Sequence, residues 1–160
     1  MKKAEKNIYT TSQALKKAAD YCVIQERCQQ EIRTKLYDWG IYNDDAEQVI
    51  AELISLGFIN EERFAKAFAG GKFRMKKWGK LKIKNELKRK NISDYCINKG
   101  LQEISHSEYL KALKEIVLKK SKEVKEKNSY KRMNRIISYA IQKGYENDLV
   151  WDIAKTMIKE

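Results

Sequence analysis

A helical pattern of apolar residues that recurs at a fixed distance constrains the fold more than any other feature of this sequence. The pattern has an apolar residue, a second small or apolar residue four positions later, and a turn residue after four more. It occurs three times, at offsets of 51 and 104 residues, as Ile32, Leu36 and Gly40, as Ile83, Leu87 and Asn91, and as Ile136, Ala140 and Gly144. A spacing of four places residues on one face of an α-helix, and a period of tens of residues is typical of repeat proteins. The chain is therefore predicted to consist of three similar helical units.

The three predicted units span residues 1–59, 60–105 and 106–160, each with three helices. One such unit is small, so its apolar stripe must be covered by its own helices and by its neighbours. The chain contains no proline, which leaves long helices uninterrupted. We predict an all-α fold of three tandem three-helix, helix-turn-helix-like repeats in an elongated, curved array. A compact nine-helix bundle is the alternative that the sequence leaves open.

Several residues carry signals for helix ends. Asn60 precedes two acidic residues, and Ser105 lies three positions before Glu108 in capping-box spacing, so both are predicted to begin helices. The pair Gly70-Gly71 is interpreted as a helix end. The charge-rich segment 119–128 is predicted to join two helices of the third unit.

Most of the positive charge lies in one short segment. Residues 1–62 hold eight basic and eleven acidic residues, residues 91–160 hold fourteen and ten, and residues 63–90 hold twelve basic residues against Glu86 alone. Such a block is the electrostatic footprint expected for a polyanionic partner, either nucleic acid or an acidic protein surface. A solvated lysine-rich face is the alternative, but twelve cations against one carboxylate favour a binding role.

The candidate binding residues surround a predicted helix from Gly79 to Lys90. In that helix Ile83 and Leu87 define the buried stripe, which leaves a broad basic surface on the other sides. The preceding run 73–80 interleaves aromatic and basic residues, a combination that can hold phosphates and stack on an unpaired base. For Trp78 itself, packing at the helix entry is the favoured interpretation. The predicted basic surface consists of Arg74, Lys76, Lys77, Trp78, Lys80, Lys82, Lys84, Lys88 and Arg89.

The sequence offers little for catalysis or metal binding. Its three cysteines form no CxxC pair and His106 is the only histidine, so we expect no zinc site. Cys22 and Cys96 fall in apolar patterns and are expected to be reduced core residues. No glycine-rich phosphate loop occurs, and neither a cofactor nor a catalytic residue is expected. Without a stretch long enough for a membrane span or a signal sequence, the protein is expected to be cytoplasmic.

Two motifs resemble the RecX family. The run from Gly57 to Phe68, followed by Gly79, Ile83, Glu86-Leu87, Lys90 and Ile92, is similar to the central repeat of that family. The first repeat fits as well, through Glu31-Ile32, Lys35-Leu36 and Gly40-Ile41. The sequence departs from the pattern at Asn91, where the family usually has Gly, although Asn tolerates the left-handed conformation of a helix C-cap. The third repeat is recognisable only as Arg135, Ile136, Gly144 and Tyr145.

The resemblance implies a three-repeat fold and a regulatory, non-catalytic function. A protein of this family is expected to bind the RecA–DNA filament and to modulate, usually inhibit, the ATPase and strand-exchange activities of the recombinase. The partners implied are the RecA filament and single- or double-stranded DNA bound independently of sequence. The resemblance implies no membrane partner, and we expect a monomer.

A stand-alone DNA-binding protein of helix-turn-helix type is the alternative function. Three-helix units can place a helix in the major groove. The sequence has no dimerisation heptad, however, and its basic helix is dominated by Lys, which suits phosphates better than base edges. These features favour the filament-binding interpretation.

Overall fold

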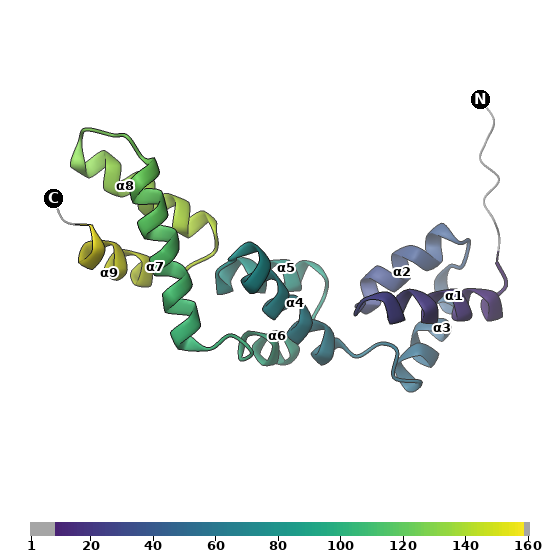
Figure 1. Ribbon diagram of the computed structural model, residues 1–160. Helices are drawn as coiled ribbons and strands as arrows, with labels where there is room; N and C mark the ends of the chain where they lie inside the picture. The colour runs from purple at the N-terminus through teal and green to yellow at the C-terminus, as the bar shows by residue number, and fades with distance from the viewer. Residues whose placement is uncertain (1–8, 159–160) are drawn as a thin grey trace, which may run out of the picture.

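The computed structural model describes residues 9–158, which form nine α-helices and no strand. Figure 1 shows them as three groups of three helices in a row, so the described chain is elongated and is not a compact nine-helix bundle. The all-α fold with tandem three-helix units is confirmed. The helices are α1 (Thr11–Ile24), α2 (Gln29–Asp38), α3 (Asn43–Ser55), α4 (Glu61–Lys76), α5 (Lys80–Arg89), α6 (Asp94–Leu101), α7 (His106–Glu123), α8 (Ser129–Gln142) and α9 (Asn147–Met157).

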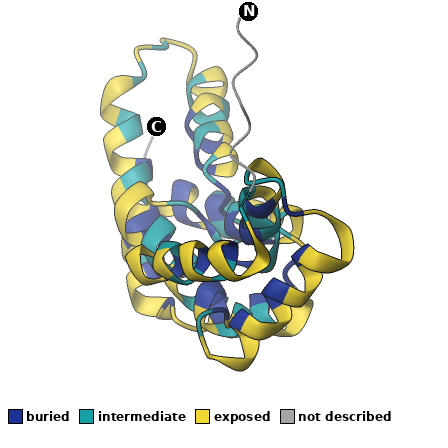
Figure 2. Ribbon diagram, turned by 90° about the vertical axis from the view of Figure 1, so that its right-hand side faces the viewer, coloured by how far each residue is buried: buried dark blue, intermediate teal, exposed yellow. Residues whose placement is uncertain are grey.

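The hydrophobic core is divided into two parts. The first unit, α1 to α3, buries a cluster of its own around Ile32, Leu36 and Leu53. A second cluster continues without a break from the second unit, α4 to α6, into the third unit, α7 to α9. Figure 2 shows the buried residues where helices face one another, with the outer faces exposed. Ile83 and Leu87 are completely buried, as the repeat pattern predicts.

The predicted helix starts at Asn60 and Ser105 are confirmed. The Arg63 backbone N–H donates to Asn60 Oδ1 at 2.9 Å, and the Glu108 N–H donates to Ser105 Oγ at 3.2 Å. Asn91 has a φ of 58°, the left-handed conformation that Asn tolerates better than most residues. This departure from the family pattern therefore leaves the chain path unchanged.

The interpretation of Gly70-Gly71 as a helix end is wrong. Both glycines lie inside α4, which ends at Lys76 and is followed by the C-cap Lys77, whose backbone is left-handed with a φ of 57°. The Arg74 guanidinium lies over Gly70, where a Cβ atom would come within 2.8 Å of Nη1. A glycine weakens a helix by about 1 kcal/mol relative to alanine, which is too little to end a helix that packs on both sides of the pair.

The predicted join in the third unit is too long. Helix α7 continues to Glu123, so only residues 124–128 connect it to α8. Lys120 Nζ lies 3.8 Å from Glu123 Oε2, one turn further along the helix. Lysine and glutamate are good helix formers, so a charge-rich segment can continue a helix after its apolar pattern has faded.

The three cysteines are free, with Cys22 and Cys28 buried and Cys96 half-buried. Burial raises the pKa of the Cys28 thiol to about 11, so this thiol is protonated and unreactive at neutral pH. Within residues 9–158 no group of three or more His, Cys, Asp and Glu could hold a metal ion. None of the helices in that range is long and apolar enough to cross a lipid bilayer.

Candidate functional site

The short connection between α4 and α5 positions most of the predicted basic surface. Helix α4 ends at Lys76 and α5 begins at Lys80, so the three residues 77–79 reverse the chain. Helix α5 buries Ile83 and Leu87 in the core, and five of its other eight positions are Lys or Arg. The basic residues thus gather at the end of one helix and along the next.

The predicted cations are largely free of acidic partners. Arg74, Lys76, Lys77, Lys88 and Arg89 are exposed, while Lys80, Lys82 and Lys84 are half-buried. Within residues 9–158 only Arg89 of this set forms a salt bridge, with Glu86 at 3.0 Å. The positive charge is therefore available to an external anion.

Three lysines surround the ring of Trp78. Lys76 and Lys82 belong to the predicted set, and Lys72 does not. The Nζ atoms of Lys72, Lys76 and Lys82 lie 5.0, 5.7 and 4.6 Å from the centroid of the indole ring. The ring itself meets Phe68 edge to face at 6.4 Å, which confirms the packing interpretation of Trp78. Its stacking on a nucleic-acid base stays a prediction. Three ammonium groups around one ring repel one another, and a bound anion would relieve that repulsion.

The other predicted cations lie apart from Trp78. Lys80 Nζ lies 4.8 Å from the ring centroid of Tyr109 in α7. Lys88 and Arg89 occupy the last turn of α5, about 9 Å further along the helix axis than Lys82. Lys84 lies between Lys82 and Lys88 in the sequence of α5. The predicted set is therefore a strip along α5 and not one compact pocket.

A second group of cations lies where the second and third units meet, and only Lys77 among them is predicted from the sequence. It lines a cavity of about 270 Å³, which we call the Lys143 pocket. The lining residues are Lys77, Glu115, Ile116, Lys119, Lys120, Glu123, Tyr139 and Lys143. Four lysines outnumber two glutamates, so the pocket extends the positive surface from α5 toward α7 and α8. Residues 77 and 143 are far apart in the sequence, and no local pattern links them.

Direct backbone contacts hold the Lys143 pocket together. The Gly79 N–H donates to Lys143 O at 2.7 Å and the Leu81 N–H to Gly144 O at 3.0 Å. A Cβ atom on Gly79 would lie 2.2 Å from the Gly144 carbonyl carbon, so only glycine permits this approach. The Tyr145 hydroxyl donates to Lys77 O at 2.9 Å. The connection that carries Lys77 is thereby fixed to the third unit.

Two buried tyrosines complete this junction. The Tyr109 hydroxyl accepts the Lys80 N–H at 3.1 Å and donates to Glu146 Oε2 at 2.8 Å. Its ring stacks on that of Tyr145 with centroids 4.9 Å apart. Burial raises the pKa of both hydroxyls, and the nearby Glu146 carboxylate adds to the shift. Both hydroxyls are protonated hydrogen-bonding groups at neutral pH and serve the structure.

The first and second units are joined by polar side chains instead. Arg63 Nε donates to Glu26 Oε1 at 2.6 Å, and Arg63 Nη2 to Gly57 O at 2.9 Å. Lys90 Nζ lies 3.7 Å from Glu31 Oε1. Buried Cys28, which precedes α2, packs with the core of the second unit. Taken together, the described residues offer a basic surface suited to holding a polyanion by non-covalent contacts.

Family models match nearly the whole described chain. The models described as the first, second and third three-helix domains of RecX match residues 14–53, 60–101 and 107–153, respectively. These three segments follow one another in the order of the family.

Individual relatives and structures agree. A protein named regulatory protein RecX from Clostridium acetobutylicum is 30% identical over 138 residues, which cover 84% of this chain and 64% of the relative. A protein of the same name from Prosthecochloris aestuarii is 28% identical over 88% of this chain and 90% of its own length. The crystal structure of RecX from Lactobacillus salivarius superposes with a TM-score of 0.81 at 22% identity, over 92% of this chain and 96% of that one.

Proposed function

This chain belongs to the RecX family, and on that premise we propose that it binds the RecA–DNA filament and inhibits the ATPase and strand-exchange activities of the recombinase. Members of the family are regulatory proteins that are not enzymes. Binding, not chemistry on a substrate, is therefore the function that the surface must explain.

One observation supports this proposal above the others. Apart from Lys66 and Lys90, the lysines of the second unit form no salt bridge among the described residues, and the Lys143 pocket continues the positive charge into the third unit. A nucleoprotein filament presents phosphates and acidic side chains over a long path. An elongated protein with a strip of unpaired cations can contact such a path at several points.

The proposal includes the kind of partner and the place of action. The DNA contacts are independent of sequence, because lysine ammonium groups recognise phosphates as point charges and do not read base edges. The protein acts as a monomer on the filament in the cytoplasm. It needs neither a metal ion nor a cofactor, and no membrane takes part.

Charge reversal tests the proposal directly. Lys76, Lys77 and Lys88 are exposed, so changing all three to Glu should leave the fold intact. We expect the concentration of protein that half-inhibits the RecA ATPase to rise at least about tenfold, and the salt dependence of filament binding to weaken. ATPase and strand-exchange assays at two salt concentrations measure both effects.

A matched variant controls for total charge. Lys16, Lys111 and Lys114 are also exposed but lie outside the basic surface, and their reversal should change inhibition by less than about twofold. Full inhibition by the first variant, or an equal loss in both variants, would refute the role of this surface. Sequence-selective binding to duplex DNA without RecA would support the helix-turn-helix alternative instead.

A further inference from the structure

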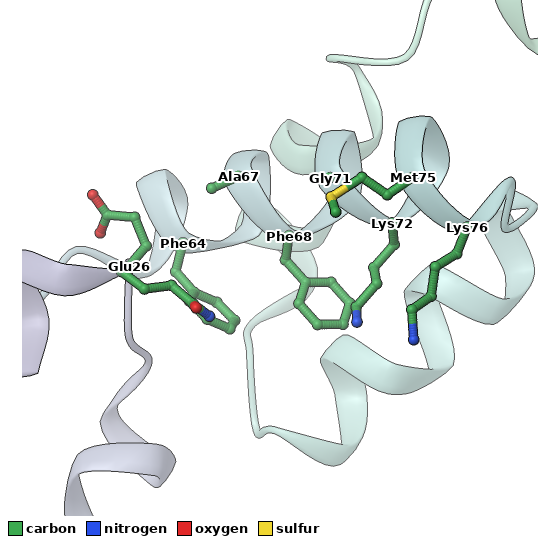
Figure 3. Close-up of a pocket in the computed structure, with 9 residues that line it drawn as sticks. Glu26, Phe64, Ala67, Phe68, Gly71, Lys72, Met75 and Lys76 are labelled. Atoms are coloured by element: carbon green, nitrogen blue, oxygen red, sulfur yellow. The ribbon is translucent and has the colours of Figure 1, made fainter.

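An apolar groove runs along α4, and residues of the first unit close one of its ends (Figure 3). We call it the α4 groove; it has a volume of about 310 Å³. Figure 3 shows Phe64, Phe68, Lys72 and Lys76 in succession along α4, with Ala67, Gly71 and Met75 beside them and Glu26 at one end. The lining residues are Gln25, Glu26, Phe64, Ala67, Phe68, Gly71, Lys72, Met75 and Lys76.

Gly71 has no internal reason to be glycine. Its backbone is helical, and a Cβ atom placed on it would meet nothing within 4 Å. A glycine inside a helix costs about 1 kcal/mol relative to alanine, and neighbouring Gly70 at least makes room for Arg74. The open space above Gly71 lets another chain approach the α4 backbone closely, a common use of glycine.

Exposed apolar residues occur in the groove and in the chain segment next to it. Met75, which lines the groove, is 86% exposed. Val23 and Ile24, which directly precede the lining residue Gln25, are 74% and 79% exposed. Neighbouring exposed apolar residues around a groove are typical of a surface that binds a protein, and a flexible methionine adapts to the shape of its partner.

The charges beside the groove indicate the chemistry of that partner. Lys72 and Lys76 lie along it without salt bridges among the described residues, and Arg74 and Lys77 are exposed nearby. The one lining carboxylate, Glu26, is paired with Arg63 at 2.6 Å. The groove is thus apolar inside and positive along one side, which complements an apolar side chain flanked by carboxylates.

We infer that the α4 groove docks a segment of a partner protein in which apolar side chains are flanked by carboxylates. This inference rests on the proposed function and deepens it, because it assigns α4 to protein contact and leaves the α5 lysines for DNA phosphates. A phosphate backbone offers nothing to fill a site lined by Phe64, Phe68 and Met75. A protein segment fills it and also pairs with the lysines.

Filling the groove from within tests the inference. In Gly71→Leu the new side chain points into open space, so the helix should gain stability while the groove is blocked. The probes are a fluorescent acidic peptide with two leucines one helical turn apart, RecA filaments on oligo(dT), and oligo(dT) alone. We expect Gly71→Leu to bind the peptide and the filaments about tenfold more weakly, because blocking the centre of an interface removes most of its binding energy. Its binding of oligo(dT) should be unchanged.

Two controls make the outcome decisive. Ala51→Leu adds the same side chain at an exposed position of α3 and should leave all three affinities unchanged. A peptide with alanine in place of both leucines should bind about tenfold more weakly to the unaltered protein, because it lacks the apolar anchors. The inference would be overturned if the unaltered protein bound both peptides equally well, or if Gly71→Leu bound the leucine peptide as tightly as the unaltered protein does. A parallel loss of oligo(dT) binding in Gly71→Leu would also overturn it.

The peptide also separates this inference from the proposed function. If the unaltered protein binds the leucine peptide but not the filaments, the proposed function fails and the groove stands as a protein-docking site. If the unaltered protein and the Gly71→Leu variant bind the filaments equally well, the proposed function stands and the inference fails.

Discussion

The two junctions between neighbouring units are built from different interactions. Between the second and third units, Gly79 and Gly144 bring two backbones into direct contact, and one hydrophobic core crosses the junction. Between the first and second units, Arg63 and its partners provide ion pairs and side-chain hydrogen bonds, and the first unit has a core of its own. Units with similar repeat patterns are thus joined in one place by burial and close packing, and in the other mainly by polar side chains.

The difference teaches how such a chain responds to its surroundings. Backbone packing and buried apolar area are insensitive to salt, whereas partly exposed ion pairs are screened by it. We therefore expect the second and third units to move as one body that carries the basic surface. The first unit, which forms one end of the α4 groove, should be easier to displace.

The largest expected effect comes from separating the Gly79 and Gly144 backbones at the junction between the second and third units, which we call the second junction. Gly79→Val places a branched side chain where even a Cβ atom would lie 2.2 Å from Gly144. We expect the free energy of unfolding to fall by about 3 kcal/mol or more, because the backbones must separate and their hydrogen bonds break. Urea denaturation followed by circular dichroism measures the loss.

Gly71→Ala is the matched control for that variant. Gly71 is helical with open space around its Cβ position, so alanine should stabilise the protein by up to about 1 kcal/mol. If Gly79→Val costs no more than a fraction of 1 kcal/mol, the second junction is not the rigid one.

A smaller, pH-dependent effect is expected from Tyr145→Phe. At neutral pH the variant loses the hydrogen bond to Lys77 O, a cost of about 1 kcal/mol. Because burial raises the pKa of folded Tyr145 above its ordinary value of 10.0, the unfolded chain loses this proton first. The stability of the unaltered protein therefore falls as pH rises above about 10, and a phenylalanine does not share that loss.

The difference in unfolding free energy between the two proteins should accordingly narrow between pH 9 and pH 11 in parallel urea titrations. Tyr130, which is 74% exposed, provides the control, since Tyr130→Phe should show no such trend. A gap that stays constant or widens would contradict the assignment of Tyr145 as a buried, protonated donor.

The smallest effect on stability should come from the first junction. Arg63→Ala removes a partly exposed ion pair, so we expect a loss of about 1 kcal/mol or less. The same change should free the first unit and expose Cys28, which is completely buried. Its alkylation rate should rise several-fold, and added salt should raise it in the unaltered protein as well.

Half-buried Cys96 is the internal reference for that measurement. Arg33→Ala breaks an equally short ion pair, Arg33 to Glu47 at 2.6 Å, but within the first unit, and should leave Cys28 protected. If neither Arg63→Ala nor salt changes the labelling of Cys28, the two junctions are equally rigid and the comparison fails.

Much of the fold could be predicted because its signals are local. The stripe of Ile83 and Leu87, the caps at Asn60 and Ser105, and the left-handed Asn91 depend on residues within a turn or two. The failures were local too. Gly70-Gly71 predicts a helix end that the structure does not have, because the packing that holds α4 together does not follow from two glycines.

The candidate site could be predicted only in part. The charge imbalance pointed to the second unit and to lysines that prove to lack acidic partners among the described residues. Lys72 was missed because its proximity to Trp78 arises from the turn between α4 and α5. Lys119, Lys120 and Lys143 of the Lys143 pocket were missed because they belong to the third unit.

The sequence by itself determined the three helical units, their order and the unit that carries the excess positive charge, since helical periodicity and charge are written in neighbouring residues. Only the tertiary structure decided how the units meet. Gly79 and Gly144 are each ordinary turn residues in the sequence, and their importance appears when the two turns lie against each other. Contacts between residues so far apart depend on the packing of whole helices, which no local pattern specifies.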